Sequence, residues 1–298
     1  TNVSRFLSWV YEYSEYIDLL VNTGDTVAHQ WSDGYGGYAA LTNVEKIINV
    51  VGNHDTLDSS VTPINWQGKK GLPAYEKLIA PWVNSWEVVQ PSNAATNGYC
   101  YFYKDYEENA LRIVFVDIMA YDDVEDVWLQ SVLSDANTRG YDVIIATHFA
   151  GSTNNNELWS FSKIKSNWST LYEMGSSNQL NPYNTEAYKM MDSVQSFIDN
   201  GGVFVGYIQG HYHAEFVAKV TQYPKQLIYS AGSAKSTEVR DYNRVVGTRF
   251  QDEFQMVSVD TYLKTVKIYK IGANIDLYGR IKNSICVNYA TGEIVSDN

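Results

Sequence analysis

Cysteines, basic residues and long apolar runs are scarce in this sequence, and each shortage argues against a class of protein. The 298 residues include only 2 cysteines, Cys100 and Cys286, with no Cys-x-x-Cys spacing. Neither a disulfide framework nor a cysteine-based zinc site is supported, and the redox compartment stays open. No apolar run approaches the ~18 residues that a membrane-spanning helix needs. The 34 acidic residues outnumber the 22 basic ones, and no basic run is longer than Lys69-Lys70. We therefore expect no nucleic-acid-binding surface.

Apolar residues are plentiful by comparison. Hydrophobic residues make up 45% of the chain and charged residues 19%, a composition typical of a globular protein with a large core. The length suits either two domains or one large α/β domain. Aromatic residues reach 14%, and packing in sheets and between helices explains them more simply than a sugar-stacking surface.

Helical and extended patterns alternate along much of the chain. The predicted helices cover 3–15, 124–137 and 187–198, and the predicted strands cover 17–21, 49–51, 99–103, 111–118, 142–147, 203–208, 226–229, 255–259 and 265–271. A polar stretch at about 151–183 interrupts the alternation and is interpreted as an insertion. Alternating helices and strands followed by paired strands predict an α/β fold or a mixed α/β sandwich.

Four of the five histidines directly follow predicted strands. They are His54, His148, His211 and His213, and the same loops contain Asp25, Asn53 and Asp55. Each of these residues alone is more simply explained as a hydrogen-bonded loop residue. Together they indicate a metal centre, because the carboxyl ends of strands are where α/β folds place their sites. Nitrogen and oxygen donors in this mixture suit Zn, Mn or Fe better than Ca.

The order of these residues is similar to a known family. Gly24-Asp25, Gly52-Asn53-His54-Asp55, His148 and Gly210-His211-Tyr212-His213 resemble, in turn, the GD, GNHD, H and GHxH motifs of the calcineurin-like metallophosphoesterases. The resemblance implies a four-layer α-β-β-α sandwich with two mixed sheets. It divides the chain into a domain at 1–272, with the insertion at about 151–183, and a C-terminal extension at 273–298 that is expected to form a hairpin.

The resemblance also implies a role for each residue. Asp25 would bridge two metal ions, Asn53, His148 and His211 would complete one metal site, and His213 would contribute to the other. His54 would not bind metal but would stabilise charge on the substrate or act as the general acid, and Asp55 would support the site without binding metal. Two divalent or trivalent transition-metal ions about 3.5–4 Å apart hold a hydroxide in line with phosphorus in such sites. The implied substrate is a small phosphomonoester or phosphodiester.

One motif of the family is missing. No Asp-x-His occurs in the 298 residues, although the family uses it at the end of its first strand for two ligands. Either the sequence is cut short or the lineage has lost half a metal site, so one metal or none is expected in this chain. A binding or scaffold protein on the same fold is therefore an alternative function, and an unrelated zinc hydrolase is a weaker one.

Two further segments leave alternatives open. The insertion contains Trp159, Phe161, Trp168 and Tyr172, which either form a substrate wall by stacking on a base, sugar or aryl group or make a small core of their own. The alternating segment at 284–298 is predicted to form a hairpin. That hairpin either covers the seam left by the missing first strand or extends the far sheet. The sequence does not specify the substrate or the oligomeric state.

Overall fold

The computed structural model describes most of the predicted elements. The described residues are 8–10, 12–26, 47–52, 55, 57–58, 62–63, 75–83, 87–150, 157–160, 181–211, 215–220, 222–232, 247–248, 253–272 and 283–297. Among these, no helix is both long and apolar enough to cross a membrane.

A seven-stranded sheet forms the centre of the molecule, in the order β5-β6-β7-β9-β11-β10-β8. Its strands are β5 (Phe102–Tyr106), β6 (Leu111–Phe115), β7 (Asp142–Ala146), β8 (Glu157–Ser160), β9 (Val203–Gln209), β10 (Phe216–Lys219) and β11 (Leu227–Ser230). Strands β6, β7, β9 and β11 run parallel. Every residue of β6 and β7 is buried, as expected for parallel strands covered on both faces. Their carboxyl ends share one edge of the sheet.

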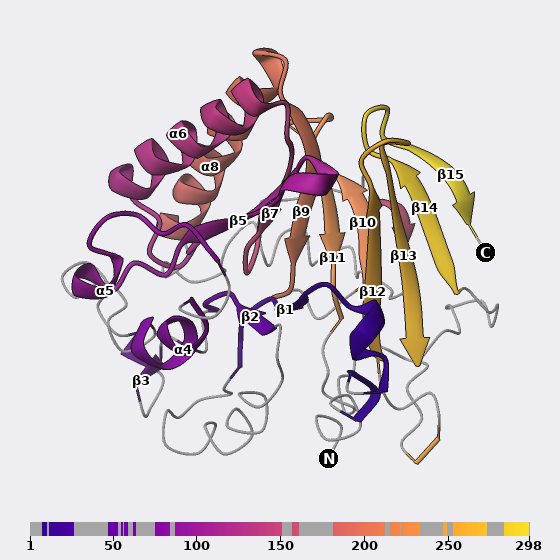
Figure 1. Cartoon of the computed structure of the whole chain (residues 1–298), viewed down its shortest axis with the longest axis horizontal. Coiled ribbons are helices and arrows are strands. Elements are labelled where there is room, and N and C mark those ends of the chain that lie inside the picture. The colour runs from indigo at the N-terminus through magenta and orange to yellow at the C-terminus, as the bar shows by residue number, and fades with distance from the viewer. Residues whose placement is uncertain are drawn as a thin grey trace.

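Two long helices, α6 (Asp123–Arg139) and α8 (Asn181–Asp199), lie side by side on one face of this sheet (Figure 1). Helix α6 begins where Asp122 caps it, accepting hydrogen bonds from the backbone N–H groups of Val124 and Glu125 at 3.0 and 2.9 Å. It ends at Gly140, whose φ of 70° a glycine adopts readily.

A second sheet lies on the other side of the seven-stranded sheet from these helices (Figure 1). Its strands follow the order β12 (Glu253–Asp260), β13 (Thr265–Gly272), β14 (Ser284–Asn288) and β15 (Glu293–Asp297), and each described pairing is antiparallel. Val257 and Val259 of β12 pack against the core. Phe254, at the alternate position, contacts Trp9 of the N-terminal helical residues, with ring centroids 5.3 Å apart. The predicted α/β class with two packed sheets is confirmed.

The remaining elements are short. They are η1 (Ser14–Tyr16), the parallel pair β1 (Leu20–Asn22) and β2 (Ile47–Asn49), the pair β3 (Leu57–Asp58) and β4 (Thr62–Pro63), η3 (Tyr75–Ile79), α4 (Ala80–Val83), α5 (Ala94–Asn97) and η4 (Glu107–Asn109). The predicted C-terminal hairpin is formed by β14 and β15, and β14 pairs with β13. In the described residues the hairpin therefore extends the far sheet rather than covering a seam beside the strand before Asp25. That strand, β1, is described as pairing with β2.

Polar contacts join the two sheets at opposite ends of β13. Before the strand, the Lys264 ammonium lies 2.9 and 2.7 Å from the two carboxylate oxygens of Asp142 on β7, and the Tyr289 hydroxyl also contacts Asp142. Near its end, Lys270 forms an ion pair with Glu215, and both side chains are buried. These pairs constrain how the sheets pack against each other.

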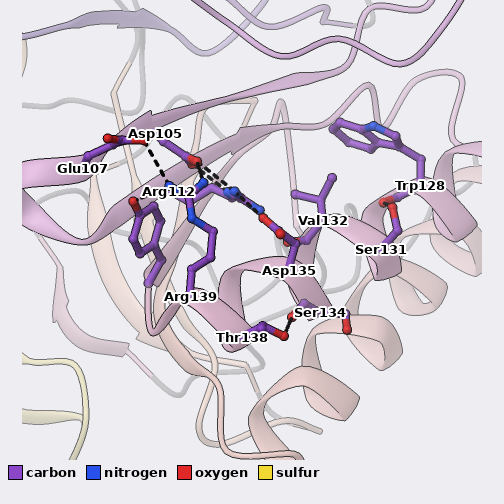
Figure 2. A network of polar contacts seen from close by, with 11 residues as sticks. Asp105, Glu107, Arg112, Trp128, Ser131, Val132, Ser134, Asp135, Thr138 and Arg139 are labelled. Carbon is purple, nitrogen blue, oxygen red and sulfur yellow. Dashed lines mark hydrogen bonds and ion pairs between the residues drawn. The ribbon is translucent and has the colours of Figure 1, made fainter.

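The buried Arg112 of β6 makes hydrogen bonds to both β5 and α6 (Figure 2). The Arg112 guanidinium donates to both carboxylate oxygens of Asp105 at 2.7 and 2.8 Å, to Asp135 at 2.7 Å and to the Val132 carbonyl at 2.7 Å. Arg139 donates to the same Asp105 at 2.6 Å. Arg112 lies near the amino end of β6, so this network supports the sheet at the edge away from the carboxyl ends of the parallel strands.

Candidate metal centre

Two of the predicted motifs begin in loops that touch each other. Strand β1 leads into Gly24-Asp25 and the parallel strand β2 leads into Gly52. A Cβ atom added to Gly52 would lie 2.3 Å from the backbone nitrogen of Asp25 and 2.4 Å from its Oδ1. Gly52 is therefore required by close approach, and the two loops hold Asp25 directly against the second motif.

The backbone of the first loop adopts an uncommon conformation. Gly24 has φ 98° and Asp25 has φ 56°. A positive φ costs glycine little but is unfavourable for a residue with a side chain, although aspartate tolerates it better than most. The surrounding contacts must therefore maintain this turn, which aims the Asp25 side chain.

Two histidines reach the same place from the seven-stranded sheet. His148 follows β7 and His211 follows β9, and these are parallel neighbours. The Gly210 N–H donates to the His148 carbonyl at 3.1 Å, so the two loops are joined directly. The His211 Nδ1 lies 3.1 Å from the His148 Nε2.

Asp25, His148 and His211 form one cluster. Each offers one ligand atom, and these atoms all lie within 4.8 Å of one another. The His148 Nε2 is 3.4 Å from the Asp25 Oδ1. Three of the five residues that the resemblance assigns to metal ligation thus converge at the carboxyl ends of strands, as expected.

The orientation of His148 suits a ligand. Its Nδ1 lies 2.7 Å from the backbone carbonyl of Thr23. A carbonyl only accepts hydrogen bonds, so Nδ1 carries the proton and donates it. Nε2 is then the atom that faces Asp25 and His211, and an imidazole held this way by its other nitrogen is the usual arrangement of a metal-binding histidine.

The electrostatics of the cluster favour a positive charge. Burial disfavours the charged imidazole and lowers the pKa of His148, but the Asp25 carboxylate and the Thr23 carbonyl raise it, and the net pKa is above the ordinary value. A metal cation would supply that positive charge, and the lone pair of the His148 Nε2 could then coordinate it. Two imidazole nitrogens and a carboxylate oxygen are a donor set that Zn, Mn and Fe accept.

Asp55 closes the turn of the second motif. Its carboxylate accepts a hydrogen bond from the Gly52 N–H at 2.9 Å, and its own N–H donates to the Gly52 carbonyl at 3.1 Å. Asp55 is fully buried. These contacts are compatible with the supporting role predicted for it, which stays a prediction.

Other predicted site residues lie outside the described part of the chain: Asn53, His54, His213, Phe161, Trp168 and Tyr172. Trp159 is described as part of β8, where it pairs with Val217 of β10. Ser160 pairs with Phe216, the first residue of β10. Within the insertion, β8 thus forms the edge strand of the seven-stranded sheet beside β10, the strand that follows His211 in the sequence. The substrate-wall assignment stays a prediction.

Sequence reasoning missed the residues behind the cluster. Thr23 contributes only a backbone carbonyl, for which its side chain gives no signal. Asn22 and Asn49 lie opposite each other at the ends of β1 and β2. The only available signal was that an asparagine stands two residues before Gly24 and another three residues before Gly52.

Comparison with known proteins identifies related sequences and folds. A family model described as calcineurin-like phosphoesterase matches residues 3–215. A search of curated proteins finds no match. Among solved structures, a crystal structure of a dimetal phosphatase from Danio rerio matches with a TM-score of 0.55 and 10% sequence identity, covering 97% of this chain and 88% of that chain. At that identity the similarity concerns the fold.

Proposed function

The chain belongs to the calcineurin-like phosphoesterase family, and from that premise we propose that it hydrolyses a small phosphomonoester or phosphodiester. Membership of the family supports metal-dependent hydrolysis of phosphoesters in general. The observation that carries the assignment to this site is the convergence of Asp25, His148 and His211, whose ligand atoms lie within 4.8 Å of one another. The dimetal phosphatase with the same fold supports it further.

These residues would hold the metal in the proposed site. Asp25 would supply a carboxylate oxygen, and His148 and His211 would supply ring nitrogens. Asn53 and His213 are proposed as further ligands because of their motifs. A bound transition metal supplies positive charge that neutralises phosphate oxygens and makes water a better nucleophile. The Thr23 carbonyl would keep His148 in the tautomer with the proton on Nδ1, so that the lone pair of Nε2 could coordinate the metal.

We assign proton transfer to His54. When the phosphorus–oxygen bond to the leaving group breaks, that oxygen takes up negative charge and needs a proton. A histidine can donate that proton, or it can stabilise the charge as a hydrogen-bond donor. His54 directly follows the proposed ligand Asn53 in the sequence, which favours it for either task.

The alternative function is a binding or scaffold protein on the same fold. The observation in its favour is that no Asp-x-His occurs in these 298 residues. Such a protein would bind one metal ion or none and would not turn over esters. Metal content and hydrolysis together distinguish the two functions.

A matched pair of aspartate variants tests the proposal. Asp25→Asn removes the carboxylate of the cluster, and Asp123→Asn removes an exposed one that pairs with Lys189 on the surface. Metal content is measured by elemental analysis after dialysis, and hydrolysis is measured with p-nitrophenyl phosphate and bis(p-nitrophenyl) phosphate in Mn²⁺. We expect Asp25→Asn to reduce kcat/KM at least ~100-fold, beyond the ~10–100-fold loss typical of residues that only orient a ligand, and Asp123→Asn to match the unmodified chain.

Bound metal without hydrolysis of either ester would support the scaffold function. Hydrolysis that Asp25→Asn leaves intact would place the chemistry elsewhere in the chain and overturn the assignment.

A further inference from the structure

We propose that Asn22 is a positioning residue, whose side-chain amide holds the Asp25 carboxylate in the orientation needed to bind metal. The proposal rests on the proposed function, since it concerns the same site. It adds a residue that none of the motifs contains, and it gives β1 and β2 a joint role in shaping the site.

The Asn22 side chain contacts the chain on both sides of Asp25. Its Oδ1 accepts a hydrogen bond from the Gly24 N–H at 3.3 Å. Its Nδ2 donates to the Thr26 hydroxyl at 2.9 Å. An amide is suited to this task because it combines an acceptor and a donor in one short side chain.

The turn between these contacts needs support. Asp25 has φ 56°, a conformation that is unfavourable for an L-amino acid. If the turn relaxed to a negative φ, the carboxylate would swing away from the His148 Nε2, which now lies 3.4 Å from the Asp25 Oδ1. Contacts to Gly24 and Thr26 oppose that change because they fix the residues before and after Asp25.

The second strand anchors Asn22 in turn. Asn22 Nδ2 also lies 3.2 Å from Asn49 Oδ1, and Asn49 Nδ2 donates to the Leu78 carbonyl at 3.3 Å. Asn49 is buried and is the register partner of Asn22. Three residues later, Gly52 packs against Asp25. The asparagine pair therefore links the loop that carries Asp25 to the loop that continues into Asn53 and His54.

Metal affinity distinguishes positioning from a general contribution to stability. Asn22→Ala removes the amide, and Thr26→Val removes only the hydroxyl that accepts from it while keeping the shape of the side chain. Asn137→Ala is the matched control, because that asparagine makes one exposed side-chain hydrogen bond, to the Asn200 carbonyl at 3.0 Å, near the far end of α6. The dissociation constant for Mn²⁺ is measured by titration calorimetry on the full chain after treatment with a chelator.

We expect Asn22→Ala to weaken Mn²⁺ binding ~10–100-fold, the range for losing a residue that orients a ligand. Thr26→Val should weaken it less, and adding Thr26→Val to Asn22→Ala should change little further, because the bond is already lost. The Mn²⁺ concentration for half-maximal hydrolysis should rise by the same factor, while kcat at saturating Mn²⁺ returns close to that of the unmodified chain. Asn137→Ala should bind Mn²⁺ normally.

Several results would overturn the proposal. One is a folded Asn22→Ala variant whose Mn²⁺ affinity is within twofold of the unmodified chain, and another is an equal loss in Asn137→Ala. If circular dichroism shows that Asn22→Ala does not fold, Thr26→Val decides, and an unchanged affinity there counts against Asn22. Failure of the unmodified chain to bind Mn²⁺ would instead count against the proposed function.

Discussion

Replacing Lys270 with methionine should destabilise the protein far more than the same change at Lys267, three positions earlier on the opposite face of β13. Lys270 pairs with Glu215 between the two sheets, and the side chains are 1% and 0% exposed. Removing one partner of a buried ion pair leaves the other charge without compensation and costs about 3–5 kcal/mol. That loss is a large share of the ~5–15 kcal/mol by which a typical domain is stable.

The same strand provides the control. Lys267 lies on the opposite face of β13, partly exposed, with its ammonium 4.7 Å from the centre of the Tyr269 ring. An exposed cation–π contact contributes about 0.5–1 kcal/mol, so Lys267→Met should lose no more than that. The double variant Lys270→Met/Glu215→Leu should recover most of the loss, because an apolar pair often replaces a buried ion pair without cost.

Thermal and urea unfolding, followed by circular dichroism and tryptophan fluorescence, measure these differences. At about 2–4 °C per kcal/mol for chains of about this size, Lys270→Met should lower the Tm by about 6–20 °C. The reasoning would be refuted if Lys270→Met and Lys267→Met were equally stable. It would also fail if the double variant lost as much as the two single variants together, because the loss would then not arise from an uncompensated charge.

Two further predictions concern other buried charges. Burial raises the pKa of Asp117 from 3.8 to about 7, so the folded chain holds this proton more tightly than the unfolded chain. The resulting stabilisation, about 4 kcal/mol at ~1.36 kcal/mol per pKa unit, is complete below pH 4 and is lost as the pH rises through 7. Asp117→Asn should flatten the dependence of the unfolding free energy on pH between 4.5 and 8, and an unchanged slope would contradict this. Arg112→Lys should lower the free energy of unfolding by about 2–4 kcal/mol, because an ammonium cannot make the planar contacts to Asp105, Asp135 and Val132 together. Arg139 is partly exposed, so Arg139→Lys should lower it by less than about 1 kcal/mol. Equal losses in the two variants, measured by urea unfolding, would contradict this prediction.

The sequence by itself predicted where the candidate metal site lies in the fold, and the type of site stays a prediction. Asp25, His148 and His211 each follow an apolar run that forms a strand. His148 and His211 follow parallel neighbouring strands of one sheet, which bring their carboxyl ends to one edge. Asp25 reaches the same place from the separate pair β1 and β2. The motif order then indicated the family, which the family model matched. The roles of Asn53, His54 and His213 stay predictions.

Only the tertiary structure decided which groups surround these residues. The Thr23 carbonyl that orients His148 is 125 positions away in the chain, and Lys270 meets Glu215 across two sheets. The C-terminal hairpin had two possible partners by sequence, and its described pairing is with β13. Local patterns specify where strands and turns occur, because they depend on neighbouring residues. Partners across the sandwich depend on how the whole core packs, which no local pattern contains.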